Sequence, residues 1–198
     1  GNVINDPHVY ANGYVGEATL YNYCLTTAAN TINRPVIAST ADNQGTQYGL
    51  YASATGGGAI TTPLFQNITT TTGGANIYAF RANGNCGALT VSDAEVSGCS
   101  SGNRMYGFYW SSAVAASTAR LRRGSFHDNV AAGTHYTLYS VSSGMDAGDV
   151  VSYGNTGGPH YAINITSTAA HNGNTHRVYN SIFSGSGQTI GFFLNQSV

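Results

Sequence analysis

Acidic side chains that could do chemistry are scarce in this chain, and two of them lie close together. Asp93 and Glu95 are two positions apart in a segment that reads as a β-strand. Because alternate residues of a strand share one face, their carboxyl groups are expected about 7 Å apart, a plausible separation for glycoside hydrolysis. Together with Asp128, they are the candidate catalytic residues of a polysaccharide hydrolase or lyase.

A structural role explains the same acids equally well. When the chain is aligned by its internal repeat, Asp93 lies near Arg123 of the next repeat, where an ion pair would form. The alignment also predicts one dense patch of charge, made of Asp128, His127, Arg120 and Arg122. At the level of the sequence, the catalytic and the structural interpretations both stay open.

Histidines and cysteines are weaker candidates. His135 and His160 occupy equivalent positions of adjacent repeats and are expected to be neighbours, where they could bind a metal or titrate together. A third ligand is missing, so we expect solvated surface histidines and no metal or other cofactor. Cys86 and Cys99 could form a disulfide within one coil, or could be small half-buried residues.

A short apolar pattern predicts the elements that position these side chains. Its six copies are Tyr48-Gly49-Leu50-Tyr51, Ile77-Tyr78-Ala79-Phe80, Tyr106-Gly107-Phe108-Tyr109, Tyr136-Thr137-Leu138-Tyr139, Tyr161-Ala162-Ile163-Asn164 and Ile190-Gly191-Phe192-Phe193. Their first residues are 29, 29, 30, 25 and 29 positions apart. Each copy follows a turn that contains glycine, which permits a sharp change of direction. A second apolar strand follows each of several copies, so every repeat holds two or three short strands.

Strands and turns at a fixed phase predict the coils of a solenoid. No coil can bury its apolar side alone, so the copies must stack. We therefore predict an all-β fold, a single-stranded parallel β-helix of about six to seven coils with about 29 residues per coil. Residues 45–198 are expected to form the β-helix, and residues 1–44 an irregular cap with a possible first coil.

Period-two alternation assigns the two faces of the first strand in each copy. The residues expected to point inward are Tyr48, Ile77, Tyr106, Tyr136, Tyr161 and Ile190, together with the residues two positions later, Leu50, Ala79, Phe108, Leu138, Ile163 and Phe192. Three positions later, the outer column holds Asn164 and five aromatic residues: Tyr51, Phe80, Tyr109, Tyr139 and Phe193. These rings could bind sugars or form the contact surface of an oligomer. If the chain bends after the third residue of the pattern, the rings become core instead.

Composition excludes several other classes of protein. Charged residues make up 8% of the chain and the formal net charge is −1, so no basic field is available to bind nucleic acid. No run of 18 apolar residues occurs, so a membrane span is not expected. With 41% hydrophobic residues, the chain is not disordered on composition.

Two segments resemble a known family. Val178-Tyr179-Asn180-Ser181-Ile182-Phe183-Ser184-Gly185 and Leu121-Arg122-Arg123-Gly124-Ser125-Phe126-His127-Asp128-Asn129 are similar to coils of pectin-lyase-like β-helices. That superfamily includes polysaccharide lyases and hydrolases, bacteriophage tailspikes and bacterial surface adhesins. The resemblance covers about residues 45–198 and implies a right-handed parallel β-helix. It carries over no catalytic motif, and the fold alone does not assign an activity.

Three functions follow as expectations. The first is an extracellular, cell-surface or virion-surface recognition protein of tailspike or adhesin type that binds polysaccharide. The second is a self-assembling structural subunit of an extracellular fibre. The third is a polysaccharide depolymerase, which the dispersed acids disfavour. Because nothing after Val198 would cap the last strand, we expect either a fragment or a homo-oligomer such as a trimer or fibre.

Overall fold

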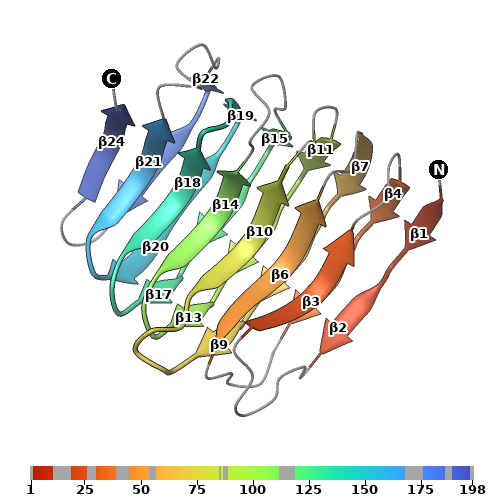
Figure 1. The fold of residues 1–198 in the computed structure, drawn as a ribbon, viewed down its shortest axis with the longest axis horizontal. Coiled ribbons are helices and arrows are strands. Elements are labelled where there is room, and N and C mark those ends of the chain that lie inside the picture. The colour runs from red at the N-terminus through yellow and green to blue at the C-terminus, as the bar shows by residue number, and fades with distance from the viewer. Residues whose placement is uncertain are drawn as a thin grey trace.

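The computed structural model describes residues 2–10, 19–25, 30–38, 45–53, 57–84, 86, 89–111, 119–167, 176–185 and 189–196. Within these ranges the protein is all-β, and its strands form a parallel β-solenoid (Figure 1). None of the described segments is a helix that could cross a membrane.

Three long parallel sheets form the walls of the solenoid. The first sheet contains β1 (Val3–Asn5), β4 (Asn30–Asn33), β7 (Gly58–Thr61), β11 (Leu89–Ser92), β15 (Arg120–Arg122), β19 (Met145–Gly148) and β22 (His176–Tyr179). The second contains β2 (His8–Tyr10), β5 (Val36–Ala38), β8 (Leu64–Gln66), β12 (Glu95–Ser97), β16 (Ser125–His127), β20 (Val151–Gly157) and β23 (Ile182–Gly185). The third contains β3 (Thr19–Leu25), β6 (Thr46–Ser53), β10 (Ile77–Asn83), β14 (Met105–Ser111), β18 (His135–Val141), β21 (His160–Ser167) and β24 (Thr189–Gln196).

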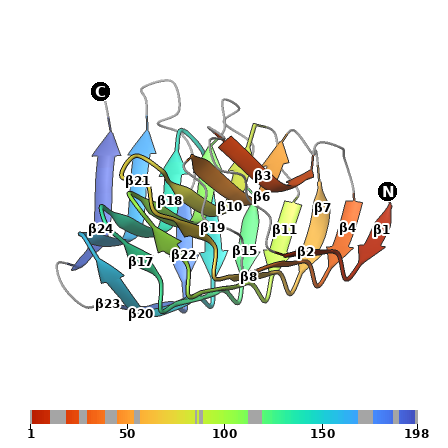
Figure 2. The same cartoon turned by 90° about the horizontal axis from the view of Figure 1, so that it is seen from below.

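Each coil visits the three sheets in the same order, and three short strands extend the second sheet: β9 (Thr69–Thr70), β13 (Ser100–Ser101) and β17 (Val130–Ala131). Paired residues of neighbouring coils are 25 positions apart at His135 and His160 and 31 apart at Gly58 and Leu89. This agrees with the expected period of about 29. The two ends of the chain lie at opposite ends of the stack (Figures 1 and 2).

The solenoid extends into the segment for which we expected a cap with a possible first coil. Strands β1, β2 and β3 pair in parallel with β4, β5 and β6. The described part of residues 1–44 therefore contains coils of the same kind as the rest of the chain.

One residue per coil has a left-handed backbone at the corner between the first and second sheets. These residues have φ between 48° and 57°, and they are Asp6, Arg34, Thr62, Asp93, Arg123, Asp149 and Asn180. Five of the seven are Asp, Asn or Thr, whose short polar side chains can bond locally; Asp and Asn tolerate this conformation best. The same corner in every coil sets the angle between the two sheets.

Apolar side chains from all three sheets fill the interior. The largest fully buried ones are aromatic, namely Phe65, Phe80, Phe108, Phe126 and Trp110. Cys86 and Cys99 are buried free thiols, so the disulfide considered from the sequence is not formed. Burial raises the pKa of the Cys99 thiol to about 12, which keeps it protonated.

A bend in the third sheet changes which side chains face inward. Gly49 and Leu50 both face the core: a Cβ on Gly49 would lie 2.7 Å from the Phe65 ring, and Leu50 is fully buried. Gly107 and Phe108 repeat this arrangement, with Phe126 facing the glycine. Because two consecutive residues point inward, the strict alternation predicted from the sequence fails at this position.

The consequence is a reversal of the predicted inner column. Ile77 is buried in the core as expected, but Tyr48, Tyr106, Tyr136 and Tyr161 lie on the outer side of the sheet. Tyr48 and Tyr106 are only 8% and 4% exposed because their neighbours shield them, yet neither belongs to the apolar core cluster. The side chain of Ile190 lies outside the described part.

Candidate functional site

The outer surface of the third sheet carries two columns of side chains, which we call the tyrosine face. The first column is Tyr48, Tyr78, Tyr106, Tyr136 and Tyr161, one residue from each of β6, β10, β14, β18 and β21. The second column on the same strands is Tyr51, Arg81, Tyr109, Tyr139 and Asn164. The in-register pairing of parallel strands places equivalent residues beside one another.

Rings of the first column stack face to face. Ring centroids are 4.9 Å apart for Tyr48 and Tyr78, 4.4 Å for Tyr78 and Tyr106, 4.9 Å for Tyr106 and Tyr136 and 5.1 Å for Tyr136 and Tyr161. Rings of the second column meet the first at their edges: Tyr109 is T-shaped to both Tyr78 and Tyr106. Such contacts between rings add stability beyond that of burial alone.

A guanidinium group replaces one ring of the second column. Arg81 donates a hydrogen bond of 2.8 Å from Nη1 to the hydroxyl of Tyr48. Its guanidinium carbon lies within 5.1–5.7 Å of the ring centroids of Tyr48, Tyr51, Tyr78 and Tyr109. A second guanidinium, that of the exposed Arg104, is hydrogen-bonded to the hydroxyl of Tyr106. Arg81 therefore acts as a cationic member of the column, held by cation–π contacts.

Positive charge on this face has no acidic partner in the described part of the chain. The described carboxylates lie on the first and second sheets or at their corners, and none is on a strand of the third sheet. Burial raises the pKa of Tyr78, Tyr106, Tyr109 and Tyr136, so these phenols stay protonated. The face presents phenol hydroxyls, ring edges, amides and two guanidinium groups.

Four of the five aromatic residues predicted for the outer column lie outside the core. Tyr51, Tyr109 and Tyr139 are half-buried in the second column, and Phe193 of β24 continues it at 39% exposure. The prediction for Phe80 is wrong: this residue is 1% exposed in the core, and Arg81 takes its place on the outer side. The sequence comparison assumed equal spacing, whereas β10 is offset by one residue, so that Tyr78 aligns with Tyr48 and Tyr106. Tyrosine at both flanking repeats was the signal that could have corrected the alignment.

The predicted catalytic acids do not form one carboxylate pair on a strand. Asp93 lies at a corner with a left-handed backbone, not on β12 with Glu95. Arg123 donates hydrogen bonds to both its carboxylate oxygens, at 2.5 and 2.8 Å. These bonds lower the pKa of Asp93. The structure therefore contains the ion pair that was the alternative interpretation.

Glu95 and Asp128 lie on either side of His127 on the second sheet. His127 Nδ1 is 2.9 Å from Asp128 Oδ2, and its Nε2 is 3.6 Å from Glu95 Oε1. Ser97 donates a 3.0 Å hydrogen bond to Glu95, and the ring of His127 stacks on Tyr153 at 5.0 Å. The cluster could move protons, but its acids are exposed and its contacts also suit a surface ion-pair ladder.

The dense charge patch predicted from the sequence is divided between two sheets. His127 and Asp128 belong to the second sheet, whereas Arg120 and Arg122 lie on the first, where both pair with Asp146 at 3.6 and 2.9 Å. The corner between the sheets separates the two groups.

His135 and His160 are neighbours, as predicted, but they are not surface residues. Their ring centroids are 4.7 Å apart and each residue is 1% exposed. Period-two alternation counted from the wrong residue had placed them outside. Burial, with the charge of His160, lowers the pKa of His135 to about 3, and burial lowers that of His160 as well. No cluster of three potential metal ligands occurs among the described residues.

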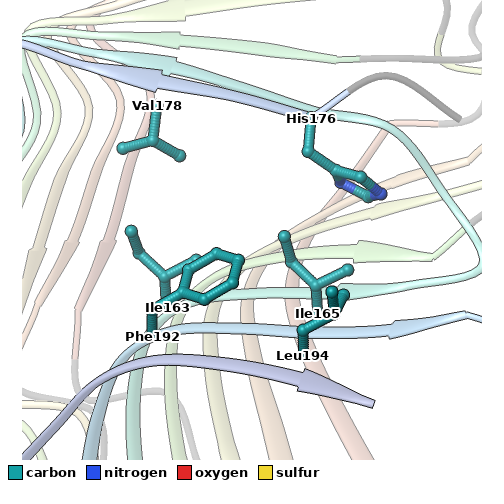
Figure 3. Close-up of a pocket in the computed structure, with 6 residues that line it drawn as sticks. All are labelled: Ile163, Ile165, His176, Val178, Phe192 and Leu194. Atoms are coloured by element: carbon teal, nitrogen blue, oxygen red, sulfur yellow. The ribbon is translucent and has the colours of Figure 1, made fainter. Parts of the chain in front are cut away.

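An apolar cavity of about 310 Å³ opens between the first and third sheets at the last described coil (Figure 3). Its walls are His176 and Val178 of β22, Ile163 and Ile165 of β21, and Phe192 and Leu194 of β24. Phe192 and Leu194 are 58% and 49% exposed, although they face the interior in Figure 3. The core is therefore open at this end of the described solenoid.

Comparisons with protein-family models, with curated proteins and with solved structures find no match to this chain. Candidate roles therefore rest on the chemistry of the side chains themselves, in the tyrosine face, in the His127 cluster and at the open end of the core.

Proposed function

We propose that the protein is a recognition module that binds polysaccharide along the tyrosine face. The observation that carries this proposal is the pair of in-register columns, rich in phenol groups, with Arg81 and Arg104 beside them. Hydroxyl, amide and guanidinium groups are the partners that sugar hydroxyls need, and rigid aromatic groups lose little entropy on binding.

The stacking geometry defines how a glycan would bind. Ring faces inside the columns are covered by neighbouring rings at 4.4–5.1 Å. A glycan would therefore meet the outward parts of the half-buried rings, including those of Tyr78, Tyr109, Tyr136 and Tyr139. A chain lying along the columns would meet the same chemistry at each coil, about every 4.8 Å. We infer an extended polymer as the ligand, and a location outside the cell or on a virion, where such polymers are met. The resemblance to tailspikes and adhesins of the pectin-lyase-like group supports the same assignment.

The test is binding of extracellular polysaccharides to Tyr109→Ala, measured by calorimetry or on a glycan array. Loss of one hydroxyl and one ring edge at the centre of the face should weaken binding about tenfold, with a smaller loss for Tyr109→Phe. Tyr153→Ala removes a 45% exposed tyrosine from the second sheet and is the matched control, which should bind like the wild type. Equal binding by all three variants would exclude the tyrosine face as the site.

The same assay separates binding from cleavage. If the glycan is shortened during incubation, the protein is a depolymerase, and the reaction should be lost in the double variant Glu95→Gln, Asp128→Asn. If the product pattern is unchanged in that variant, the His127 cluster has no role in cleavage.

End-to-end assembly is a second candidate function, favoured by the open core at β24. Described strands β22, β23 and β24 leave one edge of each sheet unpaired, and β1 and β2 leave the other. Inward residues Ile4 and Val9 of the first coil continue the columns of Val178 and Phe183. Stacking a second copy on this end would cover Phe192 and Leu194 and repeat without closing, which gives a fibre. Light scattering that detects a monomer alone at all concentrations would exclude it.

A further inference from the structure

A second cationic surface lies on the first sheet, on three adjacent strands. We call it the arginine patch, and it consists of Arg120 on β15, Asp146 on β19, Arg177 on β22, and Arg122 and Tyr179 beside them. Arg120, Asp146 and Arg177 are paired across the ladder, so their side chains leave the same face of the sheet. Three of the seven arginines of the chain are gathered here.

The patch has more positive charge than its own carboxylate can neutralise. At the corners, Arg34 and Arg123 each have one aspartate to themselves, Asp6 and Asp93, and hydrogen-bond to both its oxygens. In the patch, Arg120 and Arg122 pair with Asp146, and Arg177 has no carboxylate partner among the described residues, so these four side chains carry a summed charge of +2.

The three arginines differ in how much of their hydrogen-bonding capacity is already used. Arg122 is 24% exposed, forms an ion pair with Asp146 at 2.9 Å, and donates hydrogen bonds to the backbone carbonyls of Leu121 and Asp146. Arg120 is 54% exposed and approaches Asp146 only to 3.6 Å. Arg177 is exposed and makes no ion pair with any described residue. Donors of Arg120 and Arg177 are therefore available on either side of Asp146.

An aromatic ring lies beside these free donors. Tyr179 covers Gly148: a Cβ at that glycine would come within 2.3–2.6 Å of three atoms of the Tyr179 side chain. The ring centroid is 5.6 Å from the guanidinium carbon of Arg122, and the residue keeps 36% of its surface exposed. Glycine at this position thus lets the ring lie over the sheet next to the arginines.

We propose that the arginine patch binds a phosphate monoester carried by a saccharide. A phosphate monoester has a charge of about −1.5 to −2 at pH 7, which matches the excess charge of the patch. Its several oxygens can accept hydrogen bonds from Arg120 and Arg177 at once, while the sugar ring packs on Tyr179. The site is on a different sheet from the tyrosine face and goes beyond the polysaccharide binding proposed there.

The experiment is calorimetric titration of the whole protein with glucose 6-phosphate at low ionic strength, where screening is weak. Saturable binding is expected, with inorganic phosphate weaker, glucuronate weaker still and glucose undetectable. Arg177→Ala and Arg120→Ala should each reduce the affinity about tenfold or more, because each removes charge-assisted hydrogen bonds. Tyr179→Ala should weaken glucose 6-phosphate but leave inorganic phosphate unchanged.

Arg34→Ala is the matched control, since it removes the same charge from an exposed arginine at a distant corner. Its affinity should stay within about twofold of the wild type. The proposal is overturned if Arg34→Ala weakens binding as much as Arg177→Ala, if glucuronate binds as tightly as glucose 6-phosphate, or if no saturable binding occurs. Tyr109→Ala should leave this titration unchanged, so failure here and failure of the tyrosine face can be told apart.

Discussion

In two neighbouring coils, the space between the second and third sheets is filled in different ways, by apolar side chains in one coil and by polar side chains in the next. In one, Gly107 of the third sheet faces Phe126 of the second, and a Cβ on the glycine would lie 2.6 Å from the ring. One coil later, Thr137 takes the place of Gly107 and Ser152 that of Phe126, and their hydroxyls are 2.9 Å apart. A small residue facing a large one has become two hydroxyls that face each other.

The polar interior extends beyond this pair. Thr137 is also 3.0 Å from Nε2 of His160, and Asn155 donates to the hydroxyl of Ser152 at 2.9 Å. Asn155 in turn accepts a 2.9 Å hydrogen bond from Asn129. Asn129 and Thr137 belong to one coil and Ser152, Asn155 and His160 to the next, so the polar interior spans two adjacent coils near the open end. The ladder of backbone hydrogen bonds thus fixes the coil, while volume and polarity are balanced locally between facing positions.

The largest expected effect comes from removing the Phe126 ring from the apolar part of the interior. Phe126→Ala should lower the free energy of unfolding by about 3–5 kcal/mol, because it removes a fully buried ring and leaves a cavity. Ser152→Ala, at the paired position one coil later, should cost only about 1 kcal/mol through lost hydrogen bonds. Denaturant unfolding measures both. If both variants lose the same free energy of unfolding, Phe126 and Ser152 do not differ in their contribution to stability as their packing suggests.

Swapping the facing pair should have a smaller effect. Gly107→Thr alone should lose about 3 kcal/mol, because the new side chain meets Phe126 ring atoms at 2.6–2.8 Å and the Thr137 carbonyl at 2.8 Å. Adding Phe126→Ser creates the pair found at Thr137 and Ser152. The double variant should then be more stable than the sum of the single losses predicts, by about 1 kcal/mol or more in a double-mutant cycle. Strict additivity would show that the two positions are not coupled.

These contrasts also explain what the sequence could predict. The period, the turns and the inner columns of Leu50, Phe108 and Leu138 were legible because stacking repeats the same chemistry in each coil. The outward direction of the tyrosine side chains could not be predicted, because the bend at Gly49 and Gly107 depends on aromatic rings from another sheet. Local alternation carries no information about that contact.

The prediction of site residues was limited in the same way, because it also depends on contacts between strands. Arg81 was missed because one coil is offset by a residue, which only strand pairing reveals. The arginine patch was incomplete in the sequence because Arg177 is joined to Arg120 through Asp146 across two ladders. The ion pair of Asp93 and Arg123, by contrast, joins adjacent coils and was predictable from the repeat alone.

His135 gives an effect that depends on pH. Neither of its ring nitrogens has a hydrogen-bond partner among the described residues, and His160 is the titratable group packed against it. Its inner column holds Ile77 and Met105 in the preceding coils. A methionine at this position therefore matches the adjacent coil in shape and polarity.

Acid should destabilise the wild type through this histidine, and His135→Met should remove that part of the loss. The folded pKa is about 3 and the unfolded value is 6.5, so the unfolded chain alone takes up the proton as the pH falls below 6.5. At pH 5 this costs about 2 kcal/mol of unfolding free energy, whereas above pH 7 it costs nothing. Urea unfolding at pH 7.5 and pH 5 should show the loss in the wild type and in His8→Asn, which changes an exposed histidine. If His135→Met loses as much free energy of unfolding between pH 7.5 and pH 5 as the wild type, groups other than His135 cause the acid sensitivity.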